Sequence, residues 1–147
     1  MPGPDSTPAW LPSLLIKRGV SVGGLAPEHR LWVLGLVAAR LAQGEPAVSE
    51  AEVNARLKAC LAEEGACLAT DHVELRRWLV DTGWWRRDGY GRAYERVRQA
   101  DMRGELHPVS AALAGVDPAA WVALLRAQQA HQRESRRRAW QGGALSG

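Results

Sequence analysis

Arginines are the residues of this sequence whose type and placement suggest a chemistry. The 147 residues carry 19 lysines and arginines against 16 acids, and Lys17 and Lys58 are the two lysines. Guanidinium groups bind phosphates and carboxylates through paired hydrogen bonds and stack on flat rings. A genome rich in G and C would favour arginine in the same way, so the bias alone leaves both explanations open.

Two arginine clusters are candidates for binding a polyanion. One flanks a glycine-rich turn with an aromatic ring at its tip, which suits phosphate contact and base stacking. The other lies near the C-terminus, where five arginines between positions 126 and 138 accompany one acid, Glu134, and Trp140 follows. A solvated hairpin and a solvated helix end explain the clusters about equally well. The candidate nucleic-acid-binding residues are Arg77, Arg86, Arg87, Tyr90, Arg92, Arg136, Arg137 and Arg138.

No group of residues has the spacing of a catalytic, metal or cofactor site. The sequence lacks a nucleophile–base pattern, a Walker motif and a dinucleotide-binding motif. Cys60, Cys67 and His72 would still need a fourth ligand to hold zinc. We therefore expect two reduced thiols, no metal, no cofactor, and a binding protein rather than an enzyme.

Helix-start signals predict the elements that position these arginines. A first helix begins at Pro27 and ends near Gly44, and Ala47–Val48 forms a short extended piece. A capping box begins a second helix at Ser49 with Glu52. A third helix begins at Thr70 or Asp71, where Asp71 with Glu74 would form a second box, and Gly83 ends it. Hairpin arms at 84–87 and 92–97 follow, around Asp88-Gly89.

This order of elements is that of a winged helix. We expect a mainly α fold with a β-hairpin: a winged-helix-like three-helix module plus an additional C-terminal helix. The expected division is an N-terminal segment over residues 1–26, disordered and then docking through the patch at Trp10–Ile16, the module over 27–97, and a C-terminal extension over 98–147. The last helix starts at Asp117-Pro118, presents Trp121, Leu124 and Leu125 as its apolar face, and ends at Gly142.

The third helix would be the one that reads DNA, but its charges suit that role poorly. Residues 71–103 contain eight arginines against six acids, a weak excess for a DNA reader. Its expected exposed positions include two carboxylates, and pairing of Arg76 with Asp81 or Asp71 would make that arginine structural. Arg77 is open to either role. Trp84 and Trp85 are expected in the core by default, and the alternative is that one of them is exposed, because neighbouring strand residues face opposite sides. The expected exposed positions of the third helix are Thr70, Glu74, Arg77, Trp78 and Asp81.

Several fragments follow one another along the chain: Glu52-Val53-Asn54, Asp71, Leu75-Arg76-Arg77, Leu79-Val80-Asp81, Arg87, Gly91, Tyr94 and Arg96. In this order and spacing they resemble the bacterial family called domain of unknown function 2087. The resemblance implies a winged-helix-like domain that occurs alone or beside helix-turn-helix regulators, and it carries no established activity. Two departures are a longer stretch between Asn54 and Asp71 and the pair Trp84-Trp85 in place of aliphatic residues.

The sequence thus favours a nucleic-acid-binding or transcription-associated protein that uses the hairpin and the basic C-terminal helix to hold DNA or RNA. The alternative is a protein-interaction or dimerisation module whose third helix is a packing face. A third possibility is a small-ligand sensor with a tryptophan-lined pocket. No apolar run reaches the ~20 residues that span a bilayer, and no signal peptide is evident, so we expect a cytoplasmic protein without membrane contact.

Overall fold

The fold is mainly helical with one small antiparallel sheet, as the sequence predicts. The computed structural model describes residues 7–41, 47–88 and 93–146. The central helix α2 packs against α3, α4, α5 and α6. The elements in chain order are α1 Leu11–Leu15, α2 Pro27–Leu41, β1 Ala47–Ser49, α3 Glu50–Ala62, α4 His72–Asp81, β2 Trp85–Arg87, β3 Ala93–Arg96, the 3-10 helix η1 Gln99–Asp101, α5 Leu106–Leu113 and α6 Pro118–Ser146.

The predicted helix caps are confirmed. The Glu52 amide donates to Ser49 Oγ over 3.2 Å at the start of α3, and the Glu74 amide donates to Asp71 Oδ1 over 2.8 Å at the start of α4. Val48 and Val53 are both buried, as a hydrophobic staple requires. Gly83 follows α4 with φ of +91°, a conformation that residues with a Cβ rarely adopt. The expected end of α2 at Gly44 lies outside the described residues.

The sheet has the strand order β1–β3–β2, with both pairs antiparallel. Val48 of β1 and Arg87 of β2 both lie opposite Tyr94 in the middle strand. The predicted extended piece before α3 is therefore a third strand that completes the sheet. The tip of the hairpin, residues 89–92, lies outside the described residues.

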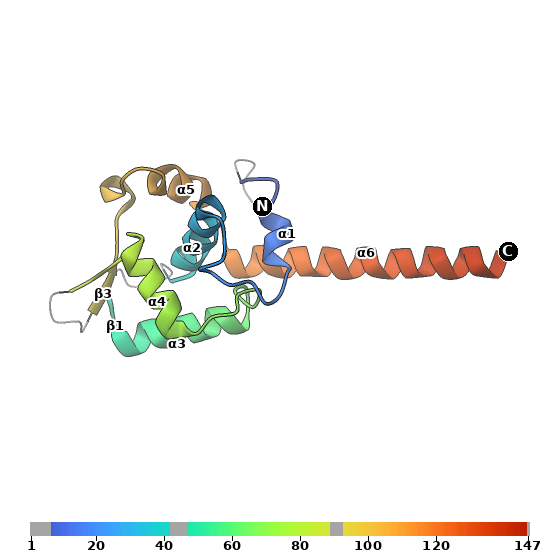
Figure 1. The fold of residues 1–147 in the computed structure, drawn as a ribbon, viewed down its shortest axis with the longest axis horizontal. Coiled ribbons are helices and arrows are strands. Elements are labelled where there is room, and N and C mark those ends of the chain that lie inside the picture. Colours follow the sequence, from blue (N-terminus) through green and yellow to red (C-terminus); the bar gives the residue numbers. More distant parts are fainter. Residues whose placement is uncertain (1–6, 42–46, 89–92, 147) are drawn as a thin grey trace.

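One hydrophobic core takes in elements from both ends of the chain. Leu11 and Leu15 of α1, Leu113 of α5 and Trp121 of α6 belong to the same buried cluster as α2, α3 and α4. The expected docking of the Trp10–Ile16 patch is confirmed, and Figure 1 shows α1 beside the base of α6. Residues before 27 and after 97 thus contribute to the core of the helical module.

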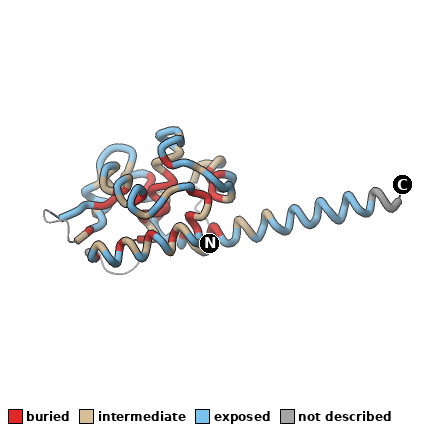
Figure 2. Tube along the Cα trace, turned by 60° about the horizontal axis from the view of Figure 1, so that its bottom comes forward, coloured by how far each residue is buried: buried red, intermediate tan, exposed pale blue. Residues whose placement is uncertain are grey.

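Helix α6 leaves this body and projects from it as a single helix (Figure 1). Its first turns bury Trp121 and Val122, whereas every residue from 131 to 142 is exposed, as the colouring of Figure 2 shows. The expected apolar face is partly wrong, because Leu124 is 38% exposed and Val122 takes the buried position. The expected end at Gly142 is also wrong, since the helix continues to Ser146.

Within the described ranges, no single helix is long and apolar enough to cross a membrane. Helix α5 and residues Pro118–Gly142 of α6, taken together, are long and apolar enough, but the two helices are bent by 72° relative to each other.

Candidate nucleic-acid interface

A groove between α4 and the hairpin brings together two of the predicted site residues. Arg77 of α4 and Arg87 of β2 both line it, with Tyr94 of β3 beside them, and its volume is about 320 Å³. Asp81 lines the same groove and opposes part of its positive charge. Within the described residues, the side chains of Arg77 and Arg87 have no hydrogen-bond or ion-pair partner, so both guanidinium groups are available to a ligand. The groove is lined by Val73, Arg76, Arg77, Val80, Asp81, Arg87 and Tyr94.

Arg76 has a structural role, but the partners expected for it are wrong. Its guanidinium donates to Asn54 Oδ1 at 2.6 Å, pairs with Glu50 Oε1 at 3.1 Å, and lies 5.6 Å from the centre of the Tyr94 ring. Asp81 and Asp71 take no part, because the bundle brings the start of α3 closer to Arg76 than either acid on or beside its own helix. Arg76 therefore ties α3, α4 and β3 together.

The expected exposed face of α4 is only partly correct. Glu74, Arg77 and Asp81 are exposed, whereas Thr70 and Trp78 are half-buried. Arg30 of α2 lies 4.6 Å from the Trp78 ring, which Gly23 also approaches, so residues distant in sequence cover this indole.

The hairpin arm presents Arg86 and Arg87 to solvent, as expected. Tyr90 and Arg92, the other two candidates at the turn, lie outside the described residues. Trp84 and Trp85 both take the core position that was expected by default, and the alternative of one exposed ring does not hold. Both are buried, because Trp84 precedes β2 and packs against α2 and α5 while Trp85 faces the core from the strand.

The second predicted cluster lies on the exposed part of α6. Arg138 Nη2 lies 2.7 Å from Glu134 Oε1, so the acid of this cluster forms an ion pair with an arginine one helical turn away. Arg126, Arg133 and Arg137 are spaced by seven and four residues, so they share one face of the helix. Trp140, which is 78% exposed, follows three residues later on that face. We call these four residues the α6 stripe.

The base of the α6 stripe runs into a second basic groove that the sequence reasoning missed. The groove has a volume of about 550 Å³, and its lining contains four cations and no acid. Arg126 also donates to the Glu63 carbonyl at 2.8 Å, which fixes its position. The sequence signal for this groove was the basic pair Lys17-Arg18, which directly follows the apolar patch Trp10–Ile16. The lining residues are Ser13, Ile16, Lys17, Arg18, Ala66, Arg126, Gln129 and Arg133.

The two basic surfaces lie at opposite ends of the molecule. In Figure 1 the sheet is at the far left, whereas α6 extends to the far right. Arg136, Arg137 and Arg138 are therefore remote from Arg77, Arg86 and Arg87, and they form a separate surface.

The two cysteines are free thiols, and both are buried. Burial raises the pKa of Cys60 far above its ordinary value, and the nearby carboxylate of Glu64 adds to the effect. Burial also raises the pKa of Cys67. Glu64 is itself buried beside Arg40, whose Nε lies 3.3 Å from Glu64 Oε1. Protonated, buried thiols are poor nucleophiles, and the described residues contain no group of three His, Cys, Asp or Glu able to hold a metal ion.

Comparison with known families identifies the central part of the chain. Residues 26–96 match the family described as an uncharacterized protein conserved in bacteria, DUF2087. This segment, from the start of α2 to the end of β3, belongs to that family. Neither the comparison with curated proteins nor that with solved structures gives a match.

Proposed function

We propose that this protein is a non-enzymatic, winged-helix-like nucleic-acid-binding protein associated with transcription. The order α2, β1, α3, α4, β2, β3 and the sheet order β1–β3–β2 favour the winged-helix assignment. In this arrangement α4 is the second helix of the pair, and the β2–β3 hairpin is the wing.

The α6 stripe is the observation that carries the proposal. The part of α6 that leaves the body, residues 131–141, is exposed on every side, so its basic face is open to a partner. The stripe offers three guanidinium groups and an exposed indole on one face, and Lys17 and Arg18 continue it at the base. Phosphates spaced along a nucleic-acid backbone match such a row, and the indole suits an unpaired base.

The α4–hairpin groove supplies a second, weaker contact in this proposal. The positively charged Arg77 and Arg87 line this groove, but Asp81 lines it too. Glu74 adds a second exposed carboxylate on α4. Carboxylates repel phosphate, so α4 is a poor reader of a duplex.

A salt titration of binding to labelled duplex DNA, single-stranded DNA and RNA tests the proposal. The variant Arg133→Gln/Arg137→Gln should bind the nucleic acid at least about tenfold more weakly at low salt. The slope of log K against log salt should become about 2 less steep, because two phosphate contacts are lost. Lys58→Gln/Arg103→Gln removes the same charge from exposed positions off the stripe and is the matched control. Absence of binding to all three probes at low salt would refute the proposal, as would an equal loss in the control.

The pair Arg77→Gln/Arg87→Gln separates the groove from the stripe. A loss of about threefold to tenfold is expected for two phosphate contacts beside an acid. Unchanged affinity would exclude the hairpin and leave α6 as the binding element.

Light scattering on the same samples examines the alternative, a dimerisation or protein-interaction module. The large exposed apolar side chains among the described residues are Val73, Leu124 and Trp140, which are too scattered for a packed helix interface. We therefore expect a monomer, and a dimer that dissociates in Leu124→Glu would favour the alternative instead.

A further inference from the structure

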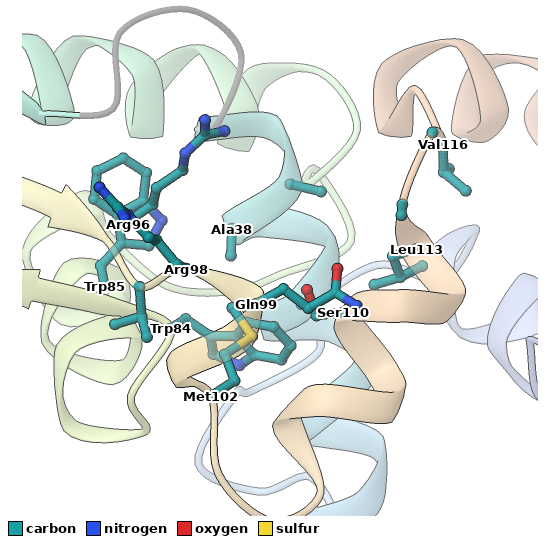
Figure 3. A pocket seen from close by; sticks show the side chains of 15 residues that line it. Ala38, Trp84, Trp85, Arg96, Arg98, Gln99, Met102, Ser110, Leu113 and Val116 are labelled. Atoms are coloured by element: carbon teal, nitrogen blue, oxygen red, sulfur yellow. The ribbon is translucent and has the colours of Figure 1, made fainter.

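A cavity lined by two buried tryptophans lies on the side of the body formed by α2, α5 and the segment that follows β3. Its volume is about 460 Å³, within the range of small-molecule sites. Figure 3 shows Trp84, Trp85, Met102 and Leu113 around it. Two indole rings, a thioether and a leucine side chain form an apolar wall of the kind that holds the body of an organic ligand.

The nitrogens of both indoles lack a hydrogen-bond partner. Trp84 is 2% exposed and Trp85 is 3% exposed, and no acceptor among the described residues lies within bonding distance of either Nε1. Buried donors in folded proteins are nearly always paired. Both indoles belong to residues that line the same cavity, so a small rotation of either ring would bring its unpaired N–H to an acceptor that enters there.

The rim of the cavity is positively charged. Arg96 and Arg98 line it together with Gln99 and Ser110, and no carboxylate lies among the lining residues. Arg98 is exposed and has no ion-pair partner within the described residues. An acceptor that also carries negative charge would satisfy both the indole donors and this rim.

The α2 wall of the cavity consists of small residues. Gly35, Ala38 and Ala39 face the space, and a Cβ at Gly35 would lie 3.0 Å from Leu113 Cδ1 and 3.1 Å from Trp84 Cζ2. The glycine thus allows Trp84 and Leu113 to approach α2 closely, while the alanines leave the neighbouring volume unfilled.

We propose that this cavity binds a small amphipathic anion, a carboxylate with an apolar body. The carboxylate accepts from the indole N–H groups and pairs with Arg98, and the apolar body packs against the tryptophan rings, Met102 and Leu113. The proposal is independent of nucleic-acid binding, because the α6 stripe contributes no residue to the cavity.

Proton–nitrogen correlation spectra of the full chain test this site, because each indole N–H gives its own signal. Octanoate is the probe, and octanamide is its uncharged counterpart with the same apolar body. Octanoate at concentrations up to about 5 mM should move the Nε1 signals of Trp84 and Trp85 to saturation. Trp84→Phe and Trp85→Phe assign the two signals, and the signal of Trp140 should stay in place.

A matched pair of surface variants keeps the test independent of folding. Arg98→Gln should weaken octanoate binding at least about fivefold, whereas Arg103→Gln, an exposed arginine that does not line the cavity, should change it less than about twofold. Octanamide should bind at least about fivefold more weakly than octanoate to the unmodified protein. The proposal is overturned if neither indole signal responds to octanoate, or if octanamide binds as well and Arg98→Gln has no effect.

Discussion

At the scale of single residues, Arg76 and Arg77 show how neighbours on one helix take different roles. Arg76 bridges to Glu50 and Asn54 of α3 and covers Tyr94, whereas Arg77 is exposed without a partner among the described residues. We predict that Arg76→Ala lowers the free energy of unfolding by about 1–3 kcal/mol, because it leaves these polar partners unsatisfied. Urea denaturation measures the change.

The variant Arg77→Ala is the matched control. It removes the same side chain from an exposed position on the same helix, so the change should stay within about 0.5 kcal/mol. An equal loss of stability in both variants would contradict the structural role of Arg76.

The buried thiols give a prediction on pH at the same scale. Because the folded state raises the pKa of Cys60 and Cys67 above 9.0, the folded protein keeps protons that the unfolded chain releases. Their contribution to stability is therefore complete below pH 9.0 and declines as the pH rises above it. Thermal unfolding on both sides of pH 9.0 should show a smaller loss of stability for Cys60→Ala/Cys67→Ala than for the unmodified protein.

Alkylation of the native protein gives a second readout for these thiols. Both cysteines should resist iodoacetamide at neutral pH until the chain is unfolded, since a buried thiol is not a thiolate. Rapid labelling of the folded protein would contradict the buried position.

At the scale of elements, the side-chain caps of α3 and α4 determine where both helices begin. Ser49→Ala and Asp71→Ala should each cost about 0.5–2 kcal/mol of stability, because each leaves an amide at the first turn without its acceptor. Ser135→Ala, within the exposed part of α6, removes a hydroxyl that caps nothing and should leave stability unchanged or slightly raised. Chemical denaturation of the three variants compares them.

The outer part of α6 contributes little to the stability of the body. Its residues from 131 to 142 are exposed and bury no core side chain. Removal of residues 132–147 should therefore shift the thermal midpoint by less than about 2 °C, while nucleic-acid binding falls to what the α4–hairpin groove and the remaining Lys17, Arg18 and Arg126 provide. A large drop in the midpoint would show that the distal helix supports the body.

At the scale of the whole molecule, the core extends beyond the segment that matches the family. Leu11 and Leu15 lie before residue 26, and Val109, Leu113 and Trp121 lie after residue 96, yet all five are buried with α2. A chain shortened to residues 26–97 would expose the surfaces that these side chains cover. It should lose cooperative unfolding, whereas residues 8–131 should retain it.

Circular dichroism during thermal unfolding measures this difference. A sharp transition for residues 26–97 at the temperature of the full chain would contradict a shared core.

Local signals in the sequence determined most of the elements. Ser49 with Glu52, Asp71 with Glu74, and Gly83 each act within a few residues, so the limits of α3 and α4 followed from the chain itself. The exposed position of Arg136 to Arg138 on a helix also followed from local pattern. Such features depend on short-range hydrogen bonds and on backbone preferences that the sequence carries directly.

Tertiary packing decided the rest, because those contacts join residues far apart in the chain. The partners of Arg76 lie more than twenty residues away, and Arg30 of α2 covers Trp78 of α4. The basic groove needs α1 and α6 side by side, and the tryptophan cavity needs β2, α5 and the small residues of α2. The sequence by itself therefore determined which arginines are available, and only the folded chain decided which of them share a surface.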